Sequence, residues 1–203
     1  MLKSIFTLAL LSLSAFTFAQ KTGNYVVVIN NDSIQINLDE SFQYKPGGGK
    51  QLDIKVIQPN ILTYTDAMIS FNYDKSLNVS NTIIDKGIEQ CMVMQSTGNG
   101  FMIQKYQTID PSSLTQLMLN ELIKESVSYG YVKKETPFKK TLQSGQTIEG
   151  IQATLSYKGE DEIYTVATYG AKDEGIIVIT MLLSEDFNDE KIIDLFLNTL
   201  RIK

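Results

Sequence analysis

Most of the chain after residue 20 alternates between apolar and polar side chains, with the period of two that is typical of β-strands. Short links rich in Gly, Asn and Asp separate many of these segments, which favours β-hairpins and an antiparallel sheet. The pattern predicts strands over residues 25–30, 34–38, 52–57, 68–73, 77–80, 88–95, 101–106, 138–142, 148–157, 163–169 and 176–183.

Two segments have the period of an amphipathic helix instead. The first begins at Asp110-Pro111, where Asp can accept bonds from free N–H groups and Pro needs no donor, and we expect it to stop at Gly130. Its predicted buried face consists of Leu114, Leu117, Met118 and Leu122.

The second helical segment closes the chain. Asn188 is its predicted N-cap, and Asp189 and Glu190 place negative charge in the first turn, where the helix dipole favours it. Its predicted apolar face consists of Ile192, Ile193, Leu195, Phe196 and Leu200.

The order of strands, helix, strands and helix predicts an α+β fold, with a central antiparallel sheet covered by two helices. Residues 61–203 form this predicted domain. Residues 20–60 contain only strand and turn signals, and they are predicted to form a β-rich N-terminal extension.

The layout from Tyr64 to Lys203 resembles the PsbP-like family of α/β/α sandwiches. The resemblance rests on Phe71-Asn72-Tyr73, on the strand over 101–107 that runs into Asp110-Pro111, and on the closing helix over 189–200. It implies an α/β/α sandwich and, usually, a non-catalytic binding or assembly role. Residues 20–60 have no place in that pattern, and fold analogy alone does not establish a function.

The first nineteen residues have the order of a secretory signal peptide. Lys3 supplies a positive start, residues 5–18 are mostly apolar, and the small Ala19 precedes a plausible cleavage site. This predicts a mature chain that starts at Gln20 in the periplasm or outside the cell. An uncleaved N-terminal anchor is the alternative. The longest later apolar run, 175–183, is too short to span a membrane and is predicted to be a central strand.

Composition then removes several kinds of chemistry. The 203 residues include no His and one Cys, so catalysis by Ser-His or Cys-His pairs and metal binding through His are excluded. The net charge of −5 argues against nucleic acid as the main partner. The segment 46–51 resembles a phosphate loop, but Gln51 follows Lys50 and a strand comes next, so we interpret it as a turn.

Carboxylates are the remaining catalytic groups. A paired-carboxylate hydrolase needs only Asp and Glu. Candidates are Glu89, Glu121, Glu125, Glu149 and Glu162, with no pairing geometry predicted. The acidic clusters at 160–162 and 185–190 lack the calcium-loop spacing, and we interpret them as a hairpin tip and a helix cap. Weak calcium binding stays open.

Two single positions also invite a chemical interpretation. Alternation places Cys91 and Val93 on the same face of an apolar strand, so we expect a buried, inert thiol. An intermolecular disulfide is the alternative. Ser33 follows Asp32 at a predicted hairpin tip and resembles a bacterial O-glycosylation acceptor, although a turn alone explains these residues.

These observations predict an exported, non-enzymatic binding or accessory protein of the bacterial cell envelope, which needs no cofactor and acts through a protein or envelope partner. One alternative is a carrier of a small apolar molecule or lipid, held in a cavity between sheet and helix. The carboxylate-based hydrolase is the second alternative. The carrier hypothesis rests on the methionines Met68, Met92, Met94, Met102 and Met118, which more often simply fill a core.

Overall fold

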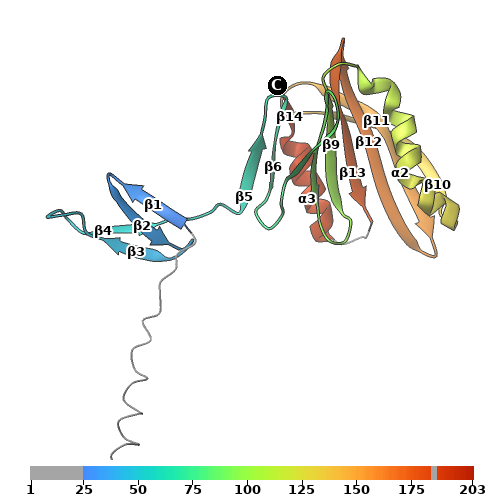
Figure 1. Ribbon diagram of the computed structural model, residues 1–203. Helices are drawn as coiled ribbons and strands as arrows, with labels where there is room; N and C mark the ends of the chain where they lie inside the picture. The colour runs from blue at the N-terminus through green and yellow to red at the C-terminus, as the bar shows by residue number, and fades with distance from the viewer. Residues whose placement is uncertain (1–24, 184–186) are drawn as a thin grey trace, which may run out of the picture. The chain divides into compact units, whose positions relative to one another are not determined.

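The computed structural model describes residues 25–183 and 187–203 (Figure 1). The chain divides into two compact units between Gln58 and Pro59, and each is described by itself. The predicted signal peptide, residues 1–19, lies outside the described residues.

The first unit consists of two hairpins. One pairs β1 with β2, and its turn starts at Asn30, which has the left-handed φ of 55°. The other pairs β3 with β4 across the predicted glycine turn, where the Gly49 N–H donates to the Pro46 carbonyl at 2.8 Å. Both predicted features, the first hairpin and the glycine turn, are confirmed. The strands are β1 Tyr25–Ile29, β2 Asp32–Ile36, β3 Ser41–Tyr44 and β4 Leu52–Lys55.

A seven-stranded antiparallel sheet forms the body of the second unit. Its strand order is β10-β11-β12-β13-β9-β8-β7. The strands are β7 Ser80–Asp85, β8 Ile88–Met94, β9 Gly100–Tyr106, β10 Val132–Thr141, β11 Thr147–Tyr157, β12 Glu160–Ala171 and β13 Glu174–Leu182.

The centre of this sheet joins two distant parts of the chain. Strand β13 pairs with β9 in a register that sets Ile179 opposite Met102. Residues 175–180 of β13 are all buried, as the long run of β-branched residues predicts. The early hairpin β8–β9 and the later meander β10–β13 are therefore one continuous sheet.

A second, three-stranded sheet lies in the same unit, in the order β14-β6-β5. Of its strands, β6 was predicted from the sequence, whereas β5 and β14 were not. The closing strand pairs Ile202 with Ile69 of β6 and so ties the end of the chain to this sheet. Its strands are β5 Ile61–Thr65, β6 Ile69–Asp74 and β14 Arg201–Ile202.

The first helical segment begins and ends where the sequence predicts. The Asp110 side chain accepts a bond from the backbone N–H of Ser112 at 2.9 Å, and Gly130 ends the helix with a φ of +113°. It comprises a 3₁₀ turn, η1 Pro111–Leu114, followed by α2 Thr115–Tyr129. Leu119 and Ile123 supply its buried residues, whereas Leu117 is 59% exposed, so its predicted burial is wrong.

The closing helix, α3 Phe187–Thr199, is held at its start by the β8–β9 turn. The fully buried Asn99 of that turn donates to the Asp189 carboxylate in the first turn of α3. The predicted capping by the side chain of Asn188 lies outside what the structure describes. Among the described residues, no helix has the length and apolar character needed to cross a membrane.

Apolar side chains cover the two faces of the large sheet in two separate clusters. Leu119 and Ile123 of α2 pack on β11 and β12 on one face. On the other face, α3 packs against β9, β13 and β6, so helix and second sheet share one core (Figure 1). Stacked rings mark its centre: the Phe101 and Phe196 centroids are 3.7 Å apart, and Phe71 meets both edge-on at 5.2 and 5.4 Å.

The predicted α/β/α sandwich, a sheet covered by two helices with a β extension, is wrong. The part of the chain that the structure describes is mostly β, with 53% strand and 17% helix. Strands extend through segments that were expected to be loops, and a second sheet takes part of the face that was assigned to a helix. The physical reason is that β5, β6 and β14 bury their alternate apolar side chains against the same core as α3.

Candidate functional site

The five candidate glutamates are spread over separate elements. Glu89 lies on β8, Glu149 on β11 and Glu162 on β12, while Glu121 and Glu125 are exposed on α2. Four of them have their own partners: Lys105 at 2.8 Å for Glu89, Lys124 at 3.7 Å for Glu121, Lys139 at 2.5 Å for Glu149, and the Ser126 hydroxyl at 2.9 Å for Glu162. This arrangement gives the hydrolase hypothesis no support from paired carboxylates.

Instead, the structure brings together an ion cluster around a buried lysine, which the sequence pattern does not show. Lys105 of β9 is 4% exposed, and its Nζ lies 2.7 Å from Oδ2 of Asp66 and 2.8 Å from Oε2 of Glu89. Asp66 belongs to the link between β5 and β6, so the cluster joins the second sheet to the large one. The sequence contains one signal for this cluster, which is the lysine in the otherwise mostly apolar strand β9. A buried ammonium needs a counter-ion, so Lys105 predicts a nearby carboxylate.

The directions of two pKa shifts keep Lys105 and Asp66 charged at neutral pH. Burial acts to lower the pKa of Lys105, but hydrogen bonds to Asp66 and Glu89 outweigh it, so the pKa lies above the usual lysine range. Burial acts to raise the pKa of Asp66, but bonds from Lys105 and from the N–H groups of Ile69 and Met68 hold it below 3.8. A lysine that stays protonated cannot act as a general base. We therefore interpret the cluster as a salt bridge that links the β5–β6 segment to the large sheet.

Tyr64 and Cys91 border the ion cluster. The Tyr64 hydroxyl lies 3.0 Å from Asp66 and 2.9 Å from Asn81, and burial together with the Asp66 hydrogen bond raises its pKa to about 12. Cys91 is fully buried, as predicted, and burial raises the pKa of its thiol to about 12. A thiol that stays protonated is a poor nucleophile, which fits inert packing.

The other predicted features are distributed as follows. Within residues 25–183 and 187–203, no three Asp, Glu or Cys side chains gather closely enough to hold a metal ion. Of the two acidic clusters, 160–162 starts β12, whereas Glu185 and Asp186 lie outside the described residues. Ser33 is exposed on β2 and does not occupy the turn itself.

The predicted methionine cavity does not form as one site. Met68 packs on the core that contains α3, whereas Met102 and Met118 pack on the opposite face of the sheet, beneath α2. The methionines therefore fill two cores, in line with the ordinary role of this flexible side chain.

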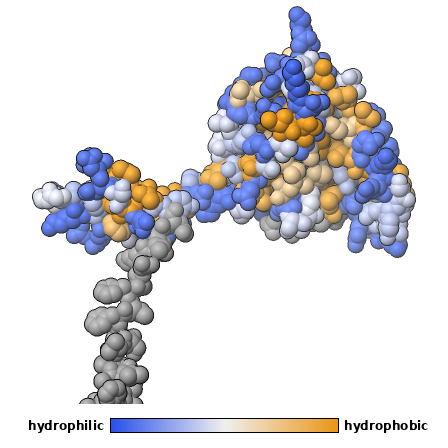
Figure 2. Space-filling view, viewed as in Figure 1, coloured by the Kyte–Doolittle hydropathy of each residue, from blue (hydrophilic) through white to orange (hydrophobic). Residues whose placement is uncertain are grey.

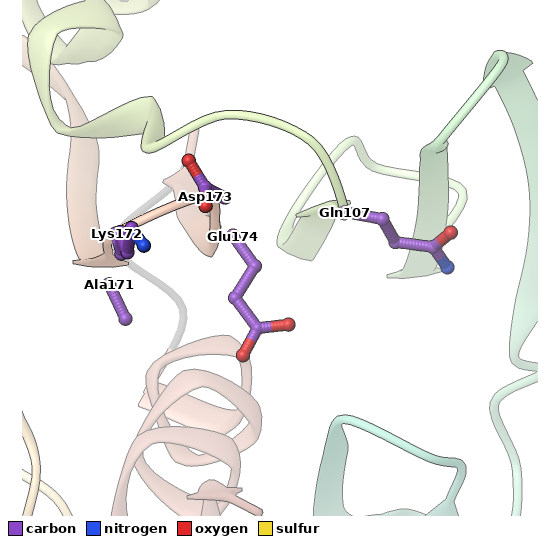
Figure 3. A pocket seen from close by; sticks show the side chains of 5 residues that line it. All are labelled: Gln107, Ala171, Lys172, Asp173 and Glu174. Atoms are coloured by element: carbon purple, nitrogen blue, oxygen red, sulfur yellow. The ribbon is translucent and has the colours of Figure 1, made fainter.

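Several surface hollows, with volumes from about 190 to about 450 Å³, lie on the second unit. One, of about 270 Å³, lies at the β12–β13 turn and is lined by Gln107 and residues 171–174. In Figure 3 the side chains of Gln107, Lys172 and Glu174 point in different directions and do not converge on a common point. Another, of about 320 Å³, lies between α3 and strands β10–β13, and both apolar and charged groups line it. A third, of about 450 Å³, lies on the other side of α3 and has a lining of the same mixed kind, which includes Ile61, Asp74 and Lys191.

Three tyrosines gather where α2 ends. Tyr129 and Tyr131 flank Gly130, whose left-handed φ reverses the chain and brings both rings to Tyr157 at the end of β11. The ring centroids are 5.2 Å apart for Tyr129–Tyr157 and 5.1 Å for the stacked pair Tyr131–Tyr157. Tyr129 is 70% exposed. We refer to Tyr129, Tyr131 and Tyr157 as the tyrosine patch.

Charges of both signs lie beside the tyrosine patch. The Lys158 ammonium lies 4.9 Å from the Tyr157 ring centroid, a cation–π contact. Burial, followed by the charge of Glu162, raises the pKa of the Tyr131 hydroxyl, so it remains a hydrogen-bond donor at neutral pH. On the face shown in Figure 2, hydrophobic areas lie among hydrophilic ones on both units.

A scan of the sequence against protein-family models finds no match, and a search of curated proteins finds none either.

Replacing Lys105 with Met should destabilise the second unit by about 2 kcal/mol, because Asp66 loses the ammonium that compensates its charge, whereas water screens the 45% exposed Glu89. Urea unfolding at pH 7 measures this loss. The matched control is Lys139→Met, which removes a lysine from an exposed pair and should cost less than about 1 kcal/mol. A Lys105→Met protein as stable as the control would contradict the assigned role.

The contribution of Asp66 should depend on pH. Because its folded-state pKa is depressed, the carboxylate stabilises the fold at neutral pH, and this stability disappears as pH falls through the folded pKa below 3.8. Asp66→Asn should therefore cost about 2 kcal/mol at pH 7 and progressively less from about pH 5 downwards. Unfolding curves of both proteins across this range measure the difference, and a constant gap would refute the assignment.

Proposed function

We propose that this chain is an exported, non-enzymatic binding or accessory protein of the bacterial cell envelope, and that it binds a protein partner through the tyrosine patch. The tyrosine patch is the observation that carries the proposal. The secretory order of the first nineteen residues supports export.

The tyrosine patch has the physical properties of a binding hot spot. Tyrosine contributes a large, rigid surface with few rotatable bonds and a hydroxyl that can hydrogen-bond at the edge of an interface. The three rings already contact one another, so little conformational entropy remains to be lost on binding. Exposed aromatic groups of this kind are enriched at the centres of protein interfaces.

Placement adds to this interpretation. The three tyrosines lie at the end of α2, just after Gly130 and at the end of β11. The elements that carry them pack on the core, which holds the rings in fixed positions. Leu119 and Ile123 anchor α2 on the sheet below. A preorganised surface on a rigid base binds with a smaller ordering cost than a flexible loop.

Removing the patch should weaken partner binding. A partner is first captured from envelope extract by cross-linking to residues 20–203. The double variant Tyr129→Ala, Tyr157→Ala should bind this partner at least about tenfold more weakly than the unchanged chain does, since each lost aromatic anchor typically costs more than 1 kcal/mol. Purified partner and surface plasmon resonance give the two affinities.

Leu117→Ala is the matched control, because Leu117 is also exposed on α2 but lies outside the patch. It should bind as the unchanged chain does. A captured partner that binds the double variant with full affinity would show that the patch is not the interface. Failure of the unchanged chain to retain any envelope protein would count against the proposal as a whole.

The hollow beside α3 favours a second candidate, carriage of a small apolar molecule. Helix α3 packs against β9 and β13, but the sheet continues to β10, and this leaves a groove of about 320 Å³ between the helix and the outer strands. This is near the lower end of the volumes typical of ligand sites. Its apolar lining comprises Phe138, Ile163, Leu182, Ile193 and Leu197, with Lys140, Glu190 and Asp194 among the charged groups.

If the groove carries a ligand, native mass spectrometry of purified residues 20–203 should show a bound small molecule, and Ile163→Trp should remove it by filling the groove. Val26→Trp, at an exposed position in the first unit, is the control and should retain the adduct. An unchanged chain without any adduct, or an Ile163→Trp protein that keeps it, would count against carriage.

A further inference from the structure

The two outer strands of the seven-stranded sheet differ in chemistry. Strand β10 is one edge and β7 the other. Each edge strand presents a row of backbone N–H and C=O groups that a further strand can pair with, and natural sheets usually block such rows with Lys, Pro or a covering element.

Strand β10 carries that protection. Its ten residues include Lys133, Lys134, Lys139 and Lys140, with Pro137 in the middle. Proline lacks the N–H that a ladder needs, and four ammonium groups repel a second strand of the same kind. Addition of a strand at β10 is therefore disfavoured.

Strand β7 has neither Lys nor Pro, and all six of its residues are exposed. Ile83 is 76% exposed, and Ile84 beside it is also exposed. The register with β8 is continuous from Ser80 to Ile83, and the irregularity comes only after Ile83. From Ser80 to Ile83, β7 thus offers a regular, uncharged edge to solvent, which continues into the exposed Ile84.

We propose that β7 is a self-association edge, where β7 of a second copy of this chain pairs antiparallel with it and continues the sheet. This inference stands apart from the tyrosine patch, which lies at the end of α2 and β11.

Charge favours a second copy as the occupant. Residues 80–84 carry no charge, so a two-fold antiparallel pair sets no like charges opposite one another in this stretch. The only charged residue of the strand, Asp85, ends it, and the symmetry places the two Asp85 side chains at opposite ends of the pair.

The blocked β10 edge limits how far such pairing can extend. Each large sheet then has one open edge, so β7-to-β7 contact uses the same surface on both copies and closes at a dimer. A six-residue strand pair buries less than the roughly 1,200 Å² of a standard stable interface. The association is therefore weak, with a dissociation constant on the order of tens of micromolar.

Sedimentation equilibrium of residues 20–203 from about 1 to about 300 µM, the range that spans such an affinity, should show a shift from monomer to dimer. Ile83→Lys adds a charge to the edge, as natural edge strands do, and should hold the protein monomeric. Val132→Lys is the matched control: Val132 is 72% exposed on the other edge strand, and this variant should dimerise as the unchanged chain does.

Hydrogen exchange identifies the strand. At the highest concentration, amides of residues 80–85 should exchange more slowly than at the lowest, and this difference should vanish in Ile83→Lys. A chain that stays monomeric throughout would overturn the proposal. Dimerisation of Ile83→Lys to the same extent as the Val132→Lys control would overturn it too, as would a dimer whose protected amides lie outside β7.

Discussion

A lysine buried in a central strand imposes the main constraint on the second unit. Lys105 lies on the same face of β9 as Phe101 and Ile103, and apolar side chains cover the rest of that face. Its charge must therefore be compensated there by a charge of opposite sign. Glu89 comes from the neighbouring strand, but Asp66 comes from a different sheet. The ion pair therefore fixes where the β5–β6 link lies on the large sheet. The stacked rings of Phe101 and Phe196, with Phe71 edge-on to both, supply apolar stabilisation around it.

This arrangement determines which surfaces the second unit leaves for other molecules. One face of the large sheet is occupied by α3 and the small sheet, and α2 covers β11 and β12 on the other. Among the surfaces that remain are the groove between α3 and β10–β13, the rim of α2, where the tyrosine patch lies, and the two edges of the sheet, of which β7 has neither Lys nor Pro. The proposed binding function would use one of these remaining surfaces.

Local features were predictable from sequence because their causes are local. The Asp110-Pro111 start, the Gly130 stop, the glycine turn and the buried β13 follow from capping, φ preference and apolar runs. The α/β/α arrangement was wrong because it depends on contacts between distant residues, such as Ile202 with Ile69. For the same reason the sequence did not show that Asp66, Glu89 and Lys105 meet, or that Tyr157 stacks on Tyr131, because neither set has a recognisable spacing.

The central claim is that the Asp66–Lys105 ion pair couples the two sheets of the second unit. A double-mutant cycle of Lys105→Met and Asp66→Asn, followed by urea unfolding at pH 7, tests it most directly. A coupling free energy of at least about 1.5 kcal/mol is the predicted result, because each substitution removes the same contact. Costs that simply add, to within about 0.5 kcal/mol, would contradict the claim.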